Sequence, residues 1–319
     1  MRIQFLNRIT MALVLGAAAC GDDDTSNANG SNSGVHGGNG NDQVGFTSPE
    51  GGEVRWEFMD FGGGVEAVRL TAFFKAAQDP DFIPFVPEGE CTEITDSNPL
   101  WPLEPSDPSN TTYYNVGNLR VGGMPQATEV QPIIGGQPDP FFRSHDVYYF
   151  TFLSNIDLAT GMDTGIDISE LIAPARTYNV EVEGNADYAP WRINAELRIP
   201  GRYPVPDAMD TANMEIQAGQ DLPLPFNDED DGFNDPVIPF VVIANSAQET
   251  THVCLGNPDE DTVVVDAATT QNMPDEGFLL HATSIHRVVP LPDENGEDTD
   301  RRLDLLGLWC YLRPFTKVQ

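Results

Sequence analysis

A regular alternation of apolar and polar residues constrains this chain most, because a period of two suits a β-strand with one buried face and does not suit a helix. The clearest alternation runs through residues 191–199, and four of its side chains are predicted to face a core: Ile193, Ala195, Leu197 and Ile199. Residues 178–183 repeat the pattern, with Tyr178, Val180 and Val182 on the apolar side. Both segments are therefore expected to be half-buried strands.

Turn-forming residues divide the rest of the chain into short segments. The 319 residues include 29 Gly and 26 Pro spread along the sequence, which favours many short strands over long helices. Apolar, β-prone runs at 53–59 and 65–75 flank a glycine-rich stretch at 60–64 and predict a hairpin. Residues 167–172 are the one helix-like piece. The predicted fold class is all-β, built from antiparallel β-sandwiches.

The length of the chain predicts two domains, since one hydrophobic core rarely serves about 300 residues. The best boundary is the proline-rich segment 200–206, because proline cannot donate a hydrogen bond to a β-ladder. Residues 47–200 are expected to form a first β-sandwich domain, and residues 206–319 a second one in tandem.

The first two dozen residues have the layout of a signal for export. Arg2 and Arg8 precede an apolar run at 9–19, which at about eleven residues is too short to cross a bilayer. Three alanines lead directly into Cys20, which resembles a bacterial lipoprotein signal. Residues 1–19 are then removed, and Cys20 carries lipid, including palmitate, on its sulfur and its new amino group. The alternative is an ordinary signal cleavage that leaves Cys20 as a free thiol.

The segment after the signal predicts a tether. Residues 20–46 hold Asp, Ser, Asn and Gly with almost no apolar side chain, so they cannot bury a core and are expected to be disordered. The acyl chains on Cys20 make membrane lipid the first expected partner. Because Gly21 rather than Asp follows the cysteine, the outer membrane is the expected location, with its periplasmic and extracellular faces both open.

Acidic residues outnumber basic residues by 50 to 16, which gives a formal net charge of −34. A chain of this charge repels phosphate groups, which argues against nucleic acid as a partner. Two interpretations of the acids stay open: a surface adapted to salty surroundings, or carboxylates gathered to bind cations.

Several segments together resemble an uncharacterised two-domain class of lipoproteins from gliding, predatory Gram-negative bacteria. They are the Ala-Cys-Gly-Asp-Asp-Asp end of the signal, the Ser/Asn/Gly tether, residues 114–123, residues 178–184 leading to 199–200, residues 218–224 and residues 253–255. The resemblance implies two β domains at a cell surface and no known chemistry. The class tends to have Trp after the Leu-Pro-Leu stretch at 222–224, where this chain has Pro225-Phe226.

Beyond Cys20 three cysteines remain, so an oxidising compartment would pair two of them and leave one thiol. All three pairings among Cys91, Cys254 and Cys310 are open. Cys254 with Cys310 is the preferred pairing, because both lie in strand-like segments of the second predicted domain. The alternative is three buried thiols without a bridge.

The sharpest candidate site is the acidic stretch 227–235. Oxygen side chains at alternate positions, a glycine at the sixth and an acid at the ninth imitate the first part of a Ca²⁺ loop. Its expected ligands are Asn227, Glu229, Asp231 and Asp235. Ile238 stands at the twelfth position, where an EF-hand needs Glu, so that family is excluded. A looser Ca²⁺ loop competes with a solvated acidic turn.

Catalytic signals are weak. His281 and His286 are five residues apart, which on a strand points them to opposite faces and disfavours joint metal ligation. No Ser or Cys lies in the sequence context of a nucleophile elbow. In a chain with 50 acidic residues any two carboxylates can lie close together, so such a pair is not evidence of a glycosidase. Four aromatic residues at strand edges are expected mainly in a core rather than at a sugar or peptide site: Tyr113, Tyr114, Trp191 and Trp309.

By elimination, the sequence predicts a lipid-anchored envelope or cell-surface protein with a non-enzymatic binding, adhesion or structural role. A surface protein or a glycan is the expected partner, contacted by loops far from the anchor. Two alternatives remain: a secreted hydrolase that uses carboxylates, and a surface module stiffened by Ca²⁺. Buried acids of raised pKa in one place would favour the hydrolase, whereas acids spread over the surface would favour the binding module.

Overall fold

The computed structural model describes residues 51–75, 89–93, 113–123, 127–134, 147–186, 188–210, 213–226, 235, 237–247, 250–257, 260–292 and 298–319. Within these ranges nearly all regular structure is β-strand, which confirms the predicted all-β class. Helix there is confined to α2 (Ala267–Asn272) and two single 3₁₀ turns, η1 (Ile168–Glu170) and η2 (Asp207–Met209). None of the helices in these ranges has the length and apolar character needed to cross a bilayer. The signal, Cys20 and the tether lie outside the described residues.

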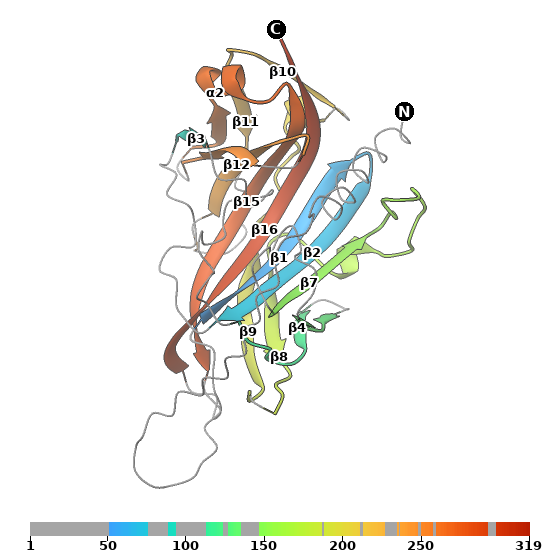
Figure 1. The fold of residues 1–319 in the computed structure, drawn as a ribbon, viewed down its shortest axis with the longest axis vertical. Helices are drawn as coiled ribbons and strands as arrows, with labels where there is room; N and C mark the ends of the chain where they lie inside the picture. Colours follow the sequence, from blue (N-terminus) through green and yellow to red (C-terminus); the bar gives the residue numbers. More distant parts are fainter. Residues whose placement is uncertain are drawn as a thin grey trace, which may run out of the picture.

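A ten-stranded sheet forms the body of the protein. Nine strands follow one another from edge to edge in the order β3 (Cys91–Glu93), β13 (Thr250–Leu255), β12 (Val237–Asn245), β15 (Glu276–Pro292), β16 (Asp298–Val318), β1 (Gly51–Gly62), β2 (Val65–Lys75), β7 (Val147–Ser154) and β6 (Ile133–Ile134). The tenth strand, β10 (Met214–Gln217), pairs with the end of β16. The long strands β15 and β16 form an antiparallel hairpin at the centre of the sheet (Figure 1).

The pairing of β1 with β16 joins the two ends of the described chain. It is parallel, and it places Gly51 opposite Arg302 and Asp60 opposite Tyr311. Strands from both predicted domains therefore share one sheet, and the expected division at 200–206 is not a boundary between sheets. Tyr203, in the middle of that segment, is buried in the core of the sheet. Pairing between strands so far apart in sequence leaves no mark in the local pattern, which is why the division was predicted wrongly.

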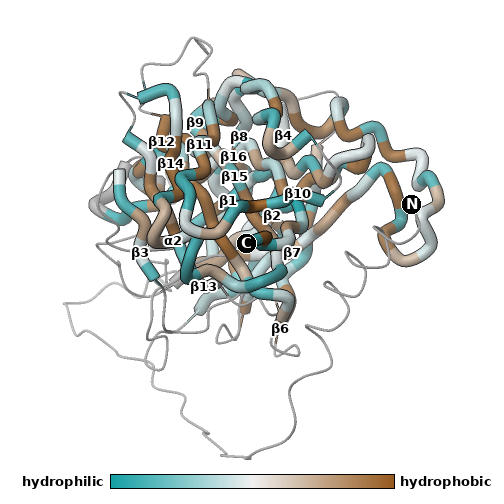
Figure 2. Tube along the Cα trace, turned by 90° about the horizontal axis from the view of Figure 1, so that it is seen from above, coloured by the Kyte–Doolittle hydropathy of each residue, from teal (hydrophilic) through white to brown (hydrophobic). Residues whose placement is uncertain are grey.

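A four-stranded antiparallel sheet covers one face of the ten-stranded sheet. Its order is β5 (Thr128–Val130), β4 (Leu119–Gly122), β8 (Arg176–Val182) and β9 (Trp191–Ile199). Figure 2 shows β9, β8 and β4 gathered on one side of β16, β15 and β1. Apolar side chains of both sheets form the largest core cluster, in which the rings of Trp56 and Tyr178 lie 6.2 Å apart between centroids. The two sheets thus pack as a β-sandwich.

A third, two-stranded antiparallel sheet consists of β11 (Leu222–Pro225) and β14 (Thr262–Val265). The short helix α2 follows β14 directly. Asp266 caps this helix, because its side chain accepts a hydrogen bond of 2.7 Å from the backbone N–H of Thr269. No helix was predicted here, and the Asp-Ala-Ala-Thr start at 266–269 is the capping signal that could have indicated it.

Two local predictions are confirmed with one exception. The hairpin around residues 60–64 forms, and its three glycines have φ between 63° and 83°, which other residues rarely adopt. In β9 the side chains of Ile193, Leu197 and Ile199 are buried as expected. Ala195 is exposed instead, because a β-bulge with φ of 56° at this residue turns its side chain outward.

Candidate functional site

Polar side chains cross the middle of the ten-stranded sheet, on the face covered by the four-stranded sheet. In the strand register, Asp60 of β1 lies beside Tyr311 of β16, which lies beside His281 of β15. Neighbouring strands are about 4.8 Å apart, so the three residues form a continuous row. Tyr311 and His281 are fully buried. We call Asp60, Tyr311 and His281 the polar row.

Tyr203 lies against the polar row and links its members. Its hydroxyl donates a hydrogen bond of 3.0 Å to the backbone oxygen of His281, and its own backbone oxygen accepts one from the hydroxyl of Tyr311. Its ring meets the rings of His281 and Tyr311 edge-on, with centroids 5.1 and 4.9 Å apart. Burial raises the pKa of Tyr203 well above its usual value, so the hydroxyl stays protonated and remains a donor.

Arg313 supplies a buried positive charge one step further along β16. Its Nε donates to the backbone oxygen of Met209 at 2.9 Å, and its Nη1 donates to the backbone oxygen of Asp60 at 2.6 Å. Its Nη2 forms an ion pair with Oδ1 of Asp60 at 3.0 Å. The guanidinium therefore joins β16, β1 and η2, and it neutralises the carboxylate at one end of the polar row.

His281 occupies the other end of the row, and its ring has no hydrogen-bond partner among the residues that the structure describes. The side chain is fully buried, and neither ring nitrogen has a hydrogen-bond partner. Burial lowers its pKa to about 3, so the imidazole is neutral at physiological pH. A ring sealed in the core does not meet a substrate, so His281 is not a candidate general base.

Glu66 is the carboxyl group best suited to acid chemistry at this end of the sheet. It lies directly opposite Asp60 across the β1–β2 hairpin. Burial raises the pKa of Glu66, as do the charges of Asp60 and Asp167, while Arg202 acts in the opposite direction. The result is a carboxyl group of raised pKa beside a second carboxyl group that forms an ion pair with Arg313.

The opposite face of the ten-stranded sheet buries two ion pairs. Glu53 pairs with Arg55 along β1, and Glu57 pairs with Arg69 on β2. All four side chains are at most 5% exposed. Burying charges costs desolvation free energy, so each pair is tolerated only because its two members neutralise one another.

The structure corrects the predicted disulfide. Cys254 of β13 is bonded to Cys91 of β3, and not to Cys310. Cys310 is a buried free thiol, and burial raises its pKa well above the usual value. The register gives the reason: Cys91 and Cys254 are direct cross-strand partners, whereas β12 and β15 separate Cys254 from β16.

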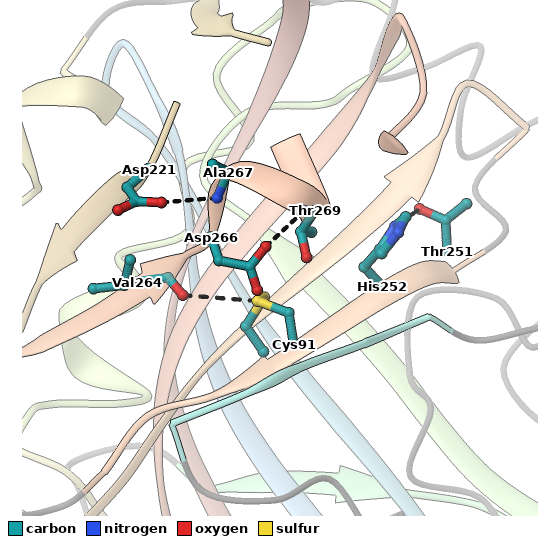
Figure 3. The surroundings of a disulfide bond; sticks show 9 residues. Cys91, Asp221, Thr251, His252, Val264, Asp266, Ala267 and Thr269 are labelled. Atoms are coloured by element: carbon teal, nitrogen blue, oxygen red, sulfur yellow. Dashed lines mark hydrogen bonds between the residues drawn. A yellow bond between two sulfur atoms is a disulfide. The ribbon is translucent and has the colours of Figure 1, made fainter. Parts of the chain in front are cut away.

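Figure 3 shows this disulfide near the start of α2. Asp221 accepts a hydrogen bond of 2.8 Å from the backbone N–H of Ala267, and Asp266 caps the helix from the other side. Burial lowers the pKa of His252, against the opposing charges of Glu93 and Asp266. The disulfide therefore fastens β3 to β13, and the bond to Asp221 ties the start of α2 to the residue before β11, so this corner has a structural role.

Asp235 is the one predicted Ca²⁺ ligand within the described ranges; Asn227, Glu229 and Asp231 lie outside them. The carboxylate of Asp235 forms an ion pair with Arg198 and a longer one, at 3.7 Å, with Arg287. A carboxylate that two guanidinium groups already hold is a poor ligand for a cation, so this pairing does not support Asp235 as a Ca²⁺ ligand. Within the described ranges no group of three or more His, Cys, Asp or Glu side chains is arranged to hold a metal ion.

The remaining sequence candidates lie where they were expected. His281 faces Tyr203 on one side of β15, and His286 bonds to Asp304 at 3.0 Å on the other. Of the four strand-edge aromatics, Tyr113 and Trp309 are buried, and Tyr114 and Trp191 pack against the core.

The polar row itself was not predicted. Arg313, a charge inside an apolar strand, is the sequence signal that could have indicated it.

Comparison with known proteins adds little. No family model matches the chain, and no curated protein matches it. Among solved structures it is similar to the FN1–FN3 domains of chicken CNTN1, with 9% identity over 65% of this chain and a TM-score of 0.19. The match spans less than two thirds, 62%, of that chain. A TM-score this low carries no argument about fold or function.

Proposed function

We propose that this protein is a lipid-anchored envelope or cell-surface protein with a non-enzymatic binding, adhesion or structural role. The observation that carries the proposal is the pairing of its buried charges. Arg55, Arg69 and Arg313 each pair with a carboxylate inside the fold. Groups tied together in this way hold strands in place and are not presented to a substrate. An all-β sandwich is compatible with such a role.

The anchor is the lipid on Cys20, and the location is the outer membrane. The test compares the full chain with its Cys20→Ala variant, both expressed in a Gram-negative host. The expected result is membrane-bound wild type whose mass includes the acyl chains, and a variant in the soluble fraction. Equal distribution of the two proteins, without added mass on the wild type, would refute the anchor.

A second candidate function, a carboxylate-dependent hydrolase, is favoured by Glu66. Glycosidases place two carboxyl groups near one another and raise the pKa of one of them, and Glu66, whose pKa is raised by burial, lies opposite Asp60. The geometry supports this function less well, because the Asp60 carboxylate is only 16% exposed and is bound by Arg313.

One experiment separates the two functions. The Cys20→Ala chain is mixed with insoluble cell-wall glycan, and both co-sedimentation and the release of reducing sugar ends are measured. We expect co-sedimentation without release, and the same behaviour from the matched variant Glu66→Gln. Release of reducing ends that Glu66→Gln abolishes would overturn the non-enzymatic role in favour of the hydrolase. If neither co-sedimentation nor release is observed, glycan is excluded as the partner and a protein partner is favoured.

A further inference from the structure

The exposed face of the four-stranded sheet carries a row of alternating charges. The register places Arg120 of β4 between Glu129 of β5 and Glu181 of β8, and Glu181 in turn lies beside Arg192 of β9. The order across the sheet is therefore negative, positive, negative, positive. With strands about 4.8 Å apart, the row is about 14 Å long. We call these four residues the charge row.

The charge row faces solvent. The side chains of Arg120 and Arg192 are 54% and 52% exposed, and that of Glu181 is 30% exposed. The residues on either side of each member along its strand mostly point inward: Val121, Thr128, Val130, Val180, Val182 and Ile193 are buried. The outer face of this sheet is thus polar and charged, and its inner face belongs to the core.

The ion pairs within the sheet leave hydrogen-bonding groups of the charge row exposed. Glu181 serves both arginines, with distances of 2.9 Å to Arg192 and 3.8 Å to Arg120. Glu129 contacts the side-chain nitrogen of Asn118 at 3.4 Å. Both arginines therefore keep exposed donors, and Glu129 keeps exposed acceptor capacity, toward a second molecule.

We propose that the charge row is the centre of a two-fold interface with a second copy of this chain. A rotation of 180° about an axis parallel to the strands reverses the row, so Glu129 meets Arg192 and Arg120 meets Glu181, each pair occurring twice. Rotation about an axis along the row would place like charges opposite one another. The charge pattern thus selects one of the two face-to-face arrangements.

Charge across the rest of the molecule supports this choice of face. Two chains of net charge −34 repel one another. The strands of the four-stranded sheet carry no net negative charge, because they hold four arginines and three glutamates. This face therefore lets two copies approach where their mutual repulsion is weakest.

The interface is small, and this sets its strength. Four strands of at most nine residues offer an area below that of a standard interface, and exposed ion pairs each contribute little. The dimer is therefore expected to be reversible and to dissociate when salt screens the charges.

The test uses the full chain with Cys20→Ala, so that no lipid brings copies together, and sedimentation equilibrium at rising protein concentration. In about 0.15 M salt, the low-salt condition of this test, the Debye length is about 8 Å, so the long-range repulsion between the two chains is largely screened and we expect dimers. In about 1 M salt, where the Debye length is near 3 Å, the contacts of the charge row are screened as well and we expect monomers. Arg192→Glu and Glu129→Arg should each give monomers at low salt. Each change turns both symmetry-related contacts between residues 129 and 192 into contacts between like charges.

The decisive variant combines both changes. Glu129→Arg with Arg192→Glu restores opposite charges across the two-fold axis, although it puts like charges side by side within each sheet. Recovered dimerisation therefore cannot come from improved pairing inside one chain. Arg302→Glu, an exposed change on β16, is the matched control and should leave the dimer intact. Monomeric wild type at low salt, a dimer unaffected by Arg192→Glu, or a double variant that stays monomeric would each overturn the proposal.

Discussion

Because the ring of His281 is buried without a hydrogen-bond partner among the described residues, the stability of the fold depends on pH. The folded-state pKa is about 3, below the ordinary value of 6.5. The folded protein therefore keeps the ring neutral, whereas the unfolded chain takes up a proton below pH 6.5. The stabilising contribution of the neutral ring is complete above pH 6.5 and is lost as the pH falls toward 3. The loss is about 2 kcal/mol between pH 6.5 and pH 5.

Urea unfolding at a series of pH values measures this effect. The His281→Phe variant keeps the ring contact with Tyr203 and has nothing to protonate, so its stability should fall less over the same range. His286→Phe is the control, because that side chain lies at the partly exposed pair with Asp304. A pH dependence identical in the wild type and His281→Phe would contradict the assignment.

Arg313 and Asp60 should be strongly coupled, because they form an ion pair in which the arginine is 4% exposed. Arg313→Met is expected to lower the free energy of unfolding by about 3–5 kcal/mol, since the Asp60 carboxylate then lacks its charged partner. The double variant with Asp60→Asn should cost less than the sum of the two single variants. Chemical unfolding of all four proteins measures the coupling, and additive losses would show that the pair does not act as a unit.

At the scale of elements, the two sheets approach one another closely at Gly307 of β16. A Cβ added there would lie 1.7 Å from the backbone oxygen of Arg198 on β9. Gly307→Ala should therefore push the sheets apart and cost about 3 kcal/mol or more. Gly64→Ala is the matched control: its Cβ meets open space, and its φ of 81° costs about 1–2 kcal/mol. Equal losses of stability in thermal unfolding would show that no close contact exists at Gly307.

The disulfide between β3 and β13 closes a sequence separation of 163 residues. Loops of this size give a disulfide a stabilising effect of about 3–5 kcal/mol through the unfolded chain. Cys91→Ala should lose this amount, whereas Cys310→Ala should lose only the packing of a small buried side chain. Peptide mapping without reductant should find Cys91 linked to Cys254; a Cys254–Cys310 peptide would instead support the pairing expected from the sequence.

The sequence indicates what is local in the fold. Alternation located β8 and β9, and the glycines at 62–64 located the β1–β2 turn, because both signals lie within a few residues of each other. The parallel pairing of β1 with β16 joins residues about 250 positions apart, so no short pattern contains it. The polar row could not be predicted for the same reason, since its members lie on three strands and become neighbours only through the strand register. The bulge at Ala195 also depends on the facing strand, where Asn179 accepts a hydrogen bond from its backbone N–H.

At the scale of the whole molecule, the negative charge lies almost entirely outside the strands. The strands that the structure describes hold 13 of the 50 acidic residues and 12 of the 16 basic residues, a net charge of −1 against −34 for the chain. The strands can therefore pair without repelling one another. The other 37 acidic residues lie outside these strands, so the repulsion between acids falls mainly on the rest of the chain.

This distribution predicts how ions affect stability. Thermal unfolding of the Cys20→Ala chain should shift to higher temperature as NaCl screens the repulsion between acidic segments. CaCl₂ at equal ionic strength should raise the unfolding temperature little further, because Arg198 and Arg287 already neutralise Asp235. A further rise of several degrees with Ca²⁺, abolished by Asp231→Asn but not by Asp235→Asn, would show that residues 227–231 hold a Ca²⁺ ion without Asp235. The surface module stiffened by Ca²⁺ would then become the leading interpretation, because an ion that binds only the folded state raises its stability in proportion to the logarithm of ion concentration.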